Sequence, residues 1–521
     1  QLPGAHVVLV ATTDLHGHVT GRDFLEGRPA PNGVARVARV ADSLRARYPG
    51  QVVLVDAGDL LQGDPFATYF ARVAPREPHP IVEAMNLAGY DAATPGNRDF
   101  DWGVPFLRRA IGDARFAYVS GNIFDLPGDT LLLPAYRVVR RQGVRIGIAG
   151  FTTPGVMVWN REQVRGHARI APIEGAAQRT LEAVRRDADL SIVLIHSGMD
   201  GRSSYDDAAV GGENVAAGLA ALRSHPDIVV VGHTHREMRD SVIGGVHFVQ
   251  PLPFGASVSV VHVSLAKMKG GQWRVRQVSA DLVPTGDVPP SDLLAQRFGA
   301  AGDSVASWLR TPLGRAAGPM RAGSARAQPT PIINFVNDVQ RRRARADLSA
   351  TPAFDLGAGF DADTIRIGQV LALYPYENTL RAIRISGDEL KSYLEWSARY
   401  FQVDAGGRVS LNDSVPGYDF DIVSGARYDI DLRRPPGDRI QRLSVGGRPV
   451  QQADSFTMAI NSRRQMGAGG YDMIRSAPVV YDKSENIPDL LMEEVRSRGP
   501  VDPAGYAAAD DQSVRVNGDL L

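Results

Sequence analysis

Seven residues of the types that bind metal ions stand in the first half of the sequence, and nearly all of them follow a short apolar run. Four such runs, among them VVLVAT at 7–12 and IVVV at 228–231, are rich in valine and isoleucine and predict buried strands of an α/β sheet. Ligands gather in the crevice beyond the carboxyl ends of such strands. We therefore expect one metal site made of Asp14, His16, Asp59, Asn97, His196, His233 and His235.

The ligand types narrow the choice of metal. Imidazole, carboxylate and one amide oxygen, with no thiolate in the chain, suit Zn, Mn, Fe, Co or Ni. Seven ligands are too many for one tetrahedral ion and suit two divalent ions about 3.5–4 Å apart, the arrangement used for in-line displacement at phosphorus. Asp59, in the turn Gly58-Asp59 at the centre of the set, is the predicted bridge between the ions.

The sequence around these residues resembles the ordered motifs of the calcineurin-like metallophosphoesterases. The longer sequence segments around these motifs resemble the bacterial 5′-nucleotidase and 2′,3′-cyclic-nucleotide 2′-phosphodiesterase (3′-nucleotidase) family. This resemblance spans almost the whole chain. The segments that carry it are DLHGH at 14–18, AGDLLQGDP at 57–65, GNRDFD at 96–101, IHSGMD at 195–200, GHTH at 232–235, ALYPYENTLRAIRISGDELKSYLEWSARYF at 372–401, YDFDIVSGARYDIDLRRPPGDRI at 418–440 and NSRRQMGAGGY at 461–471.

The resemblance implies an α/β protein with an N-terminal four-layer α/β/β/α sandwich and a C-terminal α+β substrate domain. A chain of 521 residues is long for one core. Pro284, Pro289 and Pro290 mark a break, after which Ser291–Leu309 predicts a helix with Ser291 as its cap. We therefore expect a dimetal domain at 1–285, a linker helix at 286–312 and a nucleotidase substrate-binding domain at 313–521.

The resemblance also implies how the ions are held and used. Asp14, His16, Asp59 and His235 would hold one ion, whereas Asp59, Asn97, His196 and His233 would hold the other. A hydroxide bound by the ions would attack phosphorus opposite the leaving alkoxide. The expected function is metal-dependent hydrolysis of 5′- or 3′-nucleotides, 2′,3′-cyclic nucleotides or both. The segments YPYENTL and SARYF favour the cyclic-phosphodiesterase and 3′-nucleotidase branch of the family.

One position departs from the family pattern. The family has a His after the motif Asn, paired with the Asp three places later, whereas this chain has Arg98 together with Asp101. Arginine cannot give up its proton near neutral pH, so Arg98 cannot act as a general acid. Either its guanidinium stabilises charge on the phosphoryl oxygens, or Arg98 and Asp101 form a closed salt bridge and the site turns over poorly. Asp99 is expected to cap the helix that follows.

In this family the C-terminal domain clamps a nucleobase between two aromatic rings. Tyr376 occupies one ring position, and Asn378 is the expected polar contact. Where related sequences read Asn-x-Tyr-Arg, this chain reads Asn-Ser-Arg-Arg at 461–464, so a guanidinium, which can also stack on a base, stands in for the second ring. The expected substrate-binding residues are Tyr376, Asn378, Arg463, Arg464 and Tyr471.

Composition limits the partners. Lys+Arg equals Asp+Glu at 58 each, so net charge attracts neither a nucleic-acid polymer nor an anionic membrane. No apolar stretch is long enough for a membrane span. The absence of cysteine leaves nothing to misoxidise in an oxidising compartment. We expect a monomer acting on a small nucleotide, and the resemblance implies a periplasmic or secreted protein whose signal peptide has been removed.

Two alternatives stay open. The sulfur-oxidation hydrolases share the implied fold and cleave sulfur–sulfur bonds, although the Asn97 motif and the Tyr376 region favour a nucleotide. Alternatively, since Arg98 and Arg463 both depart from family positions, the chain could be a metal-dependent nucleotide-binding protein with weak turnover.

Overall fold

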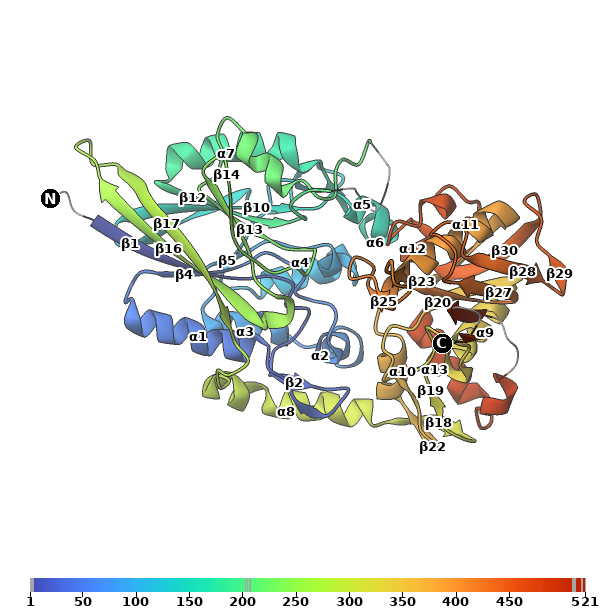
Figure 1. The fold of residues 1–521 in the computed structure, drawn as a ribbon. Helices are drawn as coiled ribbons and strands as arrows, with labels where there is room; N and C mark the ends of the chain where they lie inside the picture. The colour runs from blue at the N-terminus through green and yellow to red at the C-terminus, as the bar shows by residue number, and fades with distance from the viewer. Residues whose placement is uncertain are drawn as a thin grey trace. The chain divides into compact units, whose positions relative to one another are not determined.

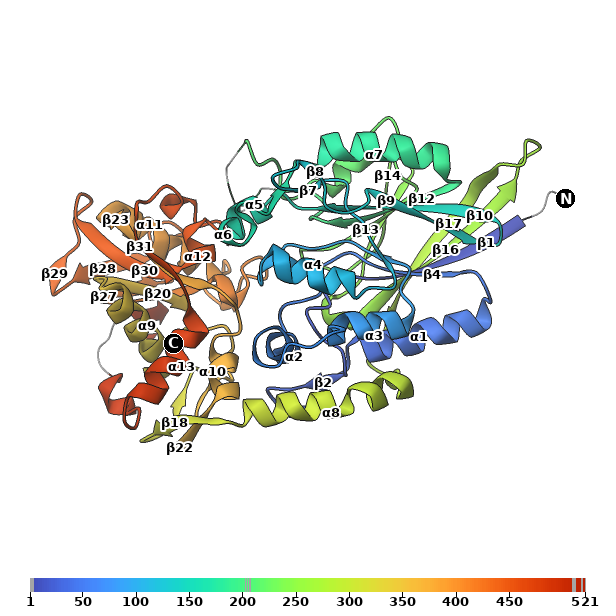
Figure 2. The same ribbon diagram turned by 180° about the vertical axis from the view of Figure 1, so that it is seen from behind.

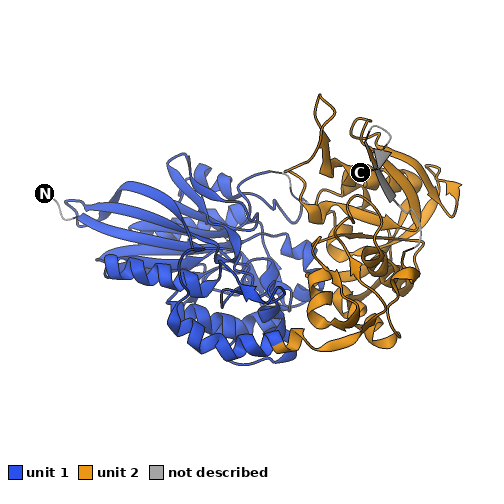
Figure 3. Cartoon of the chain, turned by 60° about the horizontal axis from the view of Figure 1, so that its bottom comes forward, with its two compact units in different colours: residues 1–306 blue, residues 307–521 orange. Residues whose placement is uncertain are grey.

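The computed structural model describes residues 4–201, 203, 205, 208–507, 512–516 and 519–520. The chain divides into two compact units, residues 1–306 (unit 1) and residues 307–521 (unit 2), as Figure 3 shows. Helix α8 (Asp292–Leu309) crosses this division and begins directly after Ser291, the predicted cap. The domain limits expected at 285 and 312 flank this helix and remain predictions. None of the helices in the described ranges has both the length and the apolar character that a membrane crossing requires.

Two six-stranded mixed sheets form the centre of the described part of unit 1. The first has the order β17-β16-β1-β4-β5-β6, and the second has the order β14-β15-β13-β12-β10-β9. The strands of the first are β1 (Gly4–Thr12), β4 (Val52–Asp56), β5 (Ala92–Ala93), β6 (Ala117–Tyr118), β16 (Ser257–Lys267) and β17 (Trp273–Pro284). Those of the second are β9 (Tyr136–Arg141), β10 (Val144–Thr152), β12 (Leu190–His196), β13 (Ile228–Val231), β14 (Met238–Ile243) and β15 (Val246–Gln250).

Helices cover the outer face of each sheet. Helices α1 (Val34–Arg47) and α3 (Pro80–Ala88) lie against the first sheet, and α7 (Ile173–Asp187) lies against the second (Figures 1 and 2). The residues that α7 buries recur at helical spacing, which produces one apolar stripe facing the sheet. They are Ile173, Ala176, Ala177, Thr180, Leu181 and Val184. The four layers α/β/β/α are those expected from the sequence.

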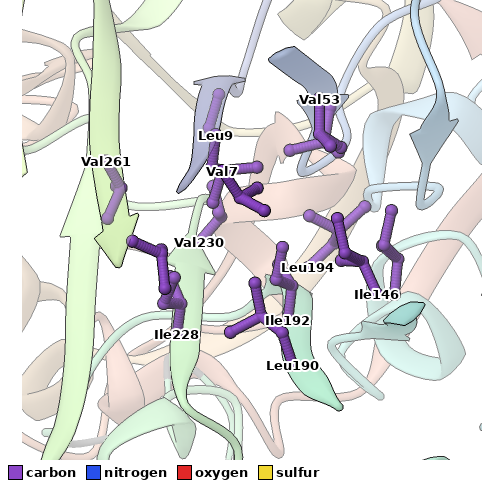
Figure 4. Close-up of a cluster of buried hydrophobic side chains, with 14 of the residues drawn as sticks. Val7, Leu9, Val53, Ile146, Leu190, Ile192, Leu194, Ile228, Val230 and Val261 are labelled. Carbon is purple, nitrogen blue, oxygen red and sulfur yellow. The ribbon is translucent and has the colours of Figure 1, made fainter. Parts of the chain in front are cut away.

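The main core of unit 1 lies between the two sheets. Val7 and Leu9 on β1 meet Ile192 and Leu194 on β12, and all four side chains are fully buried (Figure 4). Each such side chain contributes about 1.5–3 kcal/mol through burial, so together they hold the two sheets face to face. The core therefore fixes the relative position of the strand ends in both sheets.

The strands that precede the predicted ligands are parallel. In the first sheet β1 pairs with β4, with Thr12 opposite Asp56, and β4 pairs with β5. In the second sheet β12 pairs with β13, with Ile195 opposite Val231. Parallel strands end at the same edge of a sheet, so the loops after β1, β4 and β5 lie together, as do those after β12 and β13.

Shorter elements complete unit 1. The short helices are α2 (Pro65–Thr68), α4 (Val104–Gly112), α5 (Val156–Trp159) and α6 (Arg161–Val164). The short strands are β2 (Arg22–Asp23), β3 (Arg28–Pro29), β7 (Ile123–Asp125), β8 (Thr130–Leu131) and β11 (Ala168–Ile170).

Unit 2 is built on a five-stranded sheet of order β26-β20-β30-β23-β31 and a second sheet of order β29-β28-β27-β32-β33. Helix α11 begins with a capping box, in which Ser386 Oγ accepts from the Glu389 N–H and the Glu389 carboxylate accepts from the Ser386 N–H. The helices are α9 (Pro331–Ala344), α10 (Ile367–Leu373), α11 (Gly387–Ser397), α12 (Ser462–Gln465) and α13 (Ile487–Ser497).

The strands of unit 2 include several short pairs outside the two larger sheets. They are β18 (Pro312–Ala316), β19 (Met320–Arg321), β20 (Leu348–Pro352), β21 (Gly359–Phe360), β22 (Asp363–Arg366), β23 (Thr379–Ser386), β24 (Phe401–Val403), β25 (Val409–Leu411), β26 (Asp421–Ser424), β27 (Ala426–Asp431), β28 (Ile440–Val445), β29 (Arg448–Pro449), β30 (Ser455–Asn461), β31 (Val479–Asn486), β32 (Gln512–Val516) and β33 (Asp519–Leu520). Helices and sheets mixed in this way give unit 2 the α+β character expected from the sequence.

Candidate metal centre

The loops after β1, β4 and β13 and the end of β12 bring five of the predicted metal ligands together. Among the described residues, Asp14, His16 and His235 form one group whose donor atoms could share an ion. Asp14, Asp59 and His196 form a second such group. Asp59 Oδ2 lies 3.8 Å from His16 Nε2 and 3.2 Å from His196 Nε2, so its carboxylate faces both groups. The His235 side chain is 41% exposed, so the centre is open to solvent on that side.

The backbone at these residues adopts a conformation that non-glycine residues rarely take. Asp14, His16, Asp59, His233 and His235 have φ angles of 51°, 46°, 60°, 78° and 54°. Left-handed φ values cost energy for residues with a Cβ, and they persist where the surrounding structure fixes them, often at functional sites. The strain at five of the seven predicted ligands therefore supports a functional role for this edge of the sheets.

Two of the histidines are held in the tautomer that leaves Nε2 free to bind a metal. His16 Nδ1 lies 2.7 Å from the carbonyl oxygen of Gln62, and His196 Nδ1 lies 2.8 Å from that of Ala57. A carbonyl oxygen only accepts hydrogen bonds, so in each neutral ring the proton is on Nδ1. The Nε2 atoms of both rings then lie beside the Asp59 carboxylate, and that of His16 is also 3.1 Å from His235 Nε2. A carbonyl partner on the other ring nitrogen is typical of histidines that bind metal ions.

The donors at this centre fit divalent ions. The side-chain oxygen Oδ1 of Asn97 is buried and has no hydrogen-bond partner within the described residues. A buried polar atom without a partner costs on the order of 1–3 kcal/mol, which coordination to an ion would remove. Nitrogen and oxygen donors without thiolate suit the borderline and hard divalent metals.

The buried charges at the centre are strongly coupled. Burial alone would raise the pKa of Asp59, but the charge of His196 holds it below its ordinary range. Burial would lower the pKa of His196, but Asp59 and Asp14 raise it to about 10. Burial lowers the pKa of His16 to about 4, against the opposing charge of Asp59. A divalent ion at this place would therefore compete with a proton for His196.

Residue 96 must be a glycine, because Asp59 packs closely against the loop after β5 that contains Gly96 and Asn97. A Cβ atom at Gly96 would lie 2.2 Å from Asp59 Oδ1, which is too close for any other residue. The same carboxylate oxygen accepts from the backbone N–H of Arg98 at 2.7 Å. The Gly-Asn-Arg turn thus follows closely the shape of the Asp59 side chain.

Asp99 has a role that the sequence interpretation missed. Instead of capping a helix, its buried carboxylate accepts hydrogen bonds from two loops, the one after β4 and the one after β5. Oδ1 accepts from the N–H groups of Leu60 and Leu61, both at 2.8 Å. Oδ2 accepts from those of Asp59 at 3.1 Å and Gly96 at 2.7 Å. The expected cap was wrong because Asp99 lies in a short 3-10 turn (Arg98–Phe100) and points back at the preceding loops.

Arg98 and Asp101 form an ion pair. Arg98 Nη1 lies 3.2 Å from Asp101 Oδ2, and the two side chains are 12% and 6% exposed. The other oxygen of Asp101 accepts from Asn160 Nδ2 at 2.7 Å. Burial raises the pKa of Asp101, and Arg98 opposes that shift. The salt bridge proposed as one alternative is therefore present, while the catalytic role of Arg98 and Asp101 stays a prediction.

His233 lies beside the centre but outside both groups. Its ring centroid is 5.3 Å from that of His196, and its backbone N–H donates to Asp14 Oδ2 at 3.1 Å. Its Nε2 lies 2.8 Å from Glu213 Oε1, and its ring stacks on Trp159 at 5.5 Å. Glu213 and Trp159 lie outside every motif in the sequence, so only the structure shows them near the site.

Three of the five predicted substrate-binding residues, Asn378, Arg464 and Tyr471, are buried inside unit 2. Arg464 is 4% exposed, and its guanidinium binds both carboxylate oxygens of Asp421 at 2.8 and 3.0 Å and lies over the Tyr471 ring. Tyr471 is fully buried, and its hydroxyl donates to the carbonyl oxygen of Asp419 at 2.7 Å. A buried guanidinium needs acidic partners. These contacts show that Arg464 and Tyr471 contribute to the packing of unit 2, while their expected contact with substrate stays a prediction.

Tyr376 and Arg463 lie near an aromatic residue, Tyr418, that the sequence interpretation did not select. Tyr376 is half-buried with its ring 5.0 Å from that of Phe354, and Asn378 is 6% exposed. Tyr418 is 49% exposed. Burial of its hydroxyl, then the charges of Asp419 and Tyr376, raise the pKa of Tyr418, while the nearby Arg463 opposes this shift. Tyr418 could have been identified from the sequence, because it is an aromatic residue at the start of the family motif at 418–440.

Two family models match the sequence in the order of the two units. Residues 7–237 match the calcineurin-like phosphoesterase model, and residues 312–476 match the model of the 5′-nucleotidase C-terminal domain. The chain belongs to the calcineurin-like phosphoesterases that carry a 5′-nucleotidase C-terminal domain. Every predicted metal ligand lies within the first match, and every predicted substrate contact lies within the second.

Curated relatives have nucleotide phosphoesterase names. The chain is 26% identical to the trifunctional nucleotide phosphoesterase YfkN of Bacillus subtilis over 96% of its own length, but it spans only 38% of that protein. It is 28% identical to a 2′,3′-cyclic-nucleotide 2′-phosphodiesterase/3′-nucleotidase of Haemophilus influenzae, covering 95% of this chain and 86% of the relative. A protein of the same name from Yersinia enterocolitica is 26% identical, covering 88% and 80%.

Solved structures share the whole fold. A protein of Staphylococcus aureus described as a 5′-nucleotidase has a TM-score of 0.85 and 25% identity, covering 98% of this chain and all of that chain. The sulfate thiohydrolase SoxB of Thermus thermophilus has a TM-score of 0.63 and 19% identity, covering 99% and 97%. The similarity to SoxB, at this low identity, shows the fold alone. Because a sulfate thiohydrolase has this fold too, the fold by itself does not distinguish phosphorus from sulfur chemistry.

Proposed function

We propose that this chain is a metal-dependent hydrolase of nucleotide phosphoesters that uses two divalent ions. The observation that carries the proposal is the meeting of Asp14, His16, Asp59, His196 and His235 at the ends of parallel strands. The phosphoesterase and nucleotidase domains of the chain support the same reaction.

The residues of the chain divide the work. Two ions, when bound, lower the pKa of water and neutralise charge on phosphoryl oxygens. Asp14 and Asp59 supply the negative charge that holds the ions, and His16 and His196 each present Nε2. Asn97 adds a neutral oxygen, which limits the negative charge that the substrate phosphate must approach.

Arg98 supplies a fixed positive charge in this proposal. Asp101 and Asn160 hold its position through the contacts described above, and a guanidinium at this place can bind the phosphoryl oxygens as their charge increases. It cannot donate a proton to the leaving oxygen. Esters with poor leaving groups, such as nucleoside phosphates, should therefore be hydrolysed more slowly than activated esters.

Unit 2 is proposed to bind the nucleoside. Tyr376 and Tyr418 offer aromatic faces, and Arg463 offers a guanidinium plane in their neighbourhood. Stacking a base on such a surface contributes about 1–3 kcal/mol and tolerates any base. We propose 3′-nucleotides and 2′,3′-cyclic nucleotides as the preferred substrates, since relatives over most of the chain have those names.

A second candidate is a metal-dependent nucleotide-binding protein with weak turnover. The observation that favours it is the Arg98–Asp101 ion pair, which occupies the position of the general acid expected in the family. This candidate predicts nucleotide affinity without metal-dependent release of phosphate.

We further propose that the protein works in the periplasm or outside the cell, where a chain without cysteine is not exposed to thiol oxidation.

A release assay separates these functions. The protein is stripped with a chelator, dialysed, and supplied separately with Mn, Zn, Co or Ni. Phosphate release is then measured from 3′-AMP and 5′-AMP, and ring opening from 2′,3′-cyclic AMP. Metal-dependent release supports the hydrolase, whereas nucleotide binding without release under any metal supports the binding protein. Sulfate release from a thiosulfate conjugate, without phosphate release, would assign the chain to sulfur chemistry.

A further inference from the structure

The carboxylate of Glu213 holds the His233 ring from the side away from its Nδ1 atom. Glu213 is 7% exposed, and its Oε1 lies 2.8 Å from His233 Nε2. A carboxylate at this distance accepts a hydrogen bond, so the proton of the neutral ring is on Nε2. Nδ1 is then the nitrogen left for an ion. His16 and His196 have the opposite arrangement, since carbonyl oxygens fix their protons on Nδ1.

Backbone contacts fix Glu213 relative to the end of β12. Ser197, the residue after His196, donates its hydroxyl to the carbonyl oxygen of Glu213 at 2.6 Å. The same hydroxyl accepts from the N–H of Val215 at 3.0 Å. Asn214 Oδ1 accepts from the N–H of Gly198 at 3.2 Å. The loop at 213–215 is therefore fastened directly to the strand that delivers His196.

The packing leaves this loop little freedom. A Cβ atom at Gly198 would lie 2.3 Å from Asn214 Oδ1, so the two loops are in close contact. On the other side, the His233 ring stacks on Trp159 with an angle of 25° between the planes. The ring is thus held by a carboxylate at its edge and by an indole on its face.

We propose that Glu213 is a positioning residue for the second metal ion, acting through His233. Its carboxylate fixes the tautomer and orientation of the ring and makes Nδ1 a better donor. Outer partners of metal-bound histidines typically change metal affinity by about 10- to 100-fold. The proposal deepens the proposed function and rests on it, because it assumes the two-ion centre.

The test compares two substitutions that keep the side-chain volume. Glu213→Met removes the acceptor, whereas Glu213→Gln keeps an oxygen that can accept from His233 Nε2. Zn²⁺ and Mn²⁺ are titrated into chelator-stripped protein by calorimetry, which resolves the affinity of each ion. Glu174→Met, on the exposed face of α7, is the matched control.

We expect Glu213→Met to weaken one of the two ions by about 10- to 100-fold and to leave the other unchanged. Glu213→Gln should recover most of that loss, and Glu174→Met should bind both ions like the unmodified protein. Equal affinities in all four proteins, or an equal loss of both ions in both Glu213 variants, would overturn the proposal. Failure of the unmodified protein to bind two ions would instead reject the proposed function.

Discussion

The buried carboxylate of Asp99 provides the sharpest stability prediction. Each of its oxygens accepts two backbone N–H groups, from Leu60 and Leu61 at Oδ1 and from Asp59 and Gly96 at Oδ2. In Asp99→Asn one oxygen becomes an NH₂ group, so two of the four N–H groups face a donor whichever way the amide turns. Each buried N–H left without an acceptor costs about 1–3 kcal/mol, so we expect a loss of about 2–6 kcal/mol.

The assay is thermal unfolding at pH 8. Burial and the charge of Asp59 raise the pKa of Asp99 to about 6, so the carboxylate is ionised at that pH. For a unit of this size each kcal/mol shifts the midpoint by about 2 °C, which predicts a decrease of about 4–12 °C. Asp292→Asn is the control, because the Asp292 side chain is 95% exposed and its ion pair with Arg39 is worth little. A decrease no larger than that of the control would show that the four hydrogen bonds to Asp99 do not stabilise the fold.

Three further predictions concern turnover, substrate binding and pH. Arg98→His should raise turnover of a nucleoside monophosphate by about 100-fold, as general acid catalysis contributes, and should change turnover of nitrophenyl phosphate much less. Tyr418→Ala should raise KM for nucleotides by about 5- to 150-fold, since stacking is lost, and should leave nitrophenyl phosphate unaffected. Burial raises the pKa of Asp56 to about 8, so the folded protein binds more protons than the unfolded chain between pH 4 and 8. Stability should therefore fall as pH rises through this window, by more than it does in Asp56→Asn.

Each of these predictions has an outcome that contradicts it. Equal rates for the unmodified protein and Arg98→His on both substrates would show that residue 98 does not govern the leaving group. An unchanged KM for nucleotides in Tyr418→Ala would remove Tyr418 from the substrate site. If the free energy of unfolding changes equally with pH in the unmodified protein and in Asp56→Asn between pH 4 and 8, Asp56 is ionised throughout that range.

The meeting of the candidate metal ligands at one edge could be predicted because their positions follow from local patterns. His196 is the last residue of a buried β-strand, and Asp14 comes two residues after another. Parallel pairing then brings such strand ends to a common edge, whatever the loops do in detail. The four layers of unit 1 follow equally directly, because strands buried on both faces must be covered by helices.

The supporting residues could not be predicted, because their roles depend on how loops fold back. Asp99 was expected to cap a helix, yet it binds loops about forty residues earlier in the chain. Glu213 reaches His233 only because Ser197 fastens its loop to β12. Arg464 lies in a motif typical of substrate contact, but the buried Asp421 and the partly exposed Asp419 both bind its guanidinium. Spacing in the sequence contains no signal for such tertiary pairs.

Two ions are proposed to bind at one edge of unit 1. Anomalous X-ray diffraction from crystals soaked in MnCl₂ or ZnCl₂ tests this binding most directly. We expect two anomalous peaks about 3.5–4 Å apart, in contact with Asp14, Asp59 and His196, and at least one of them absent in crystals of Asp59→Asn. A single peak, or peaks remote from these three side chains, would contradict the two-ion centre and the hydrolysis proposed for it.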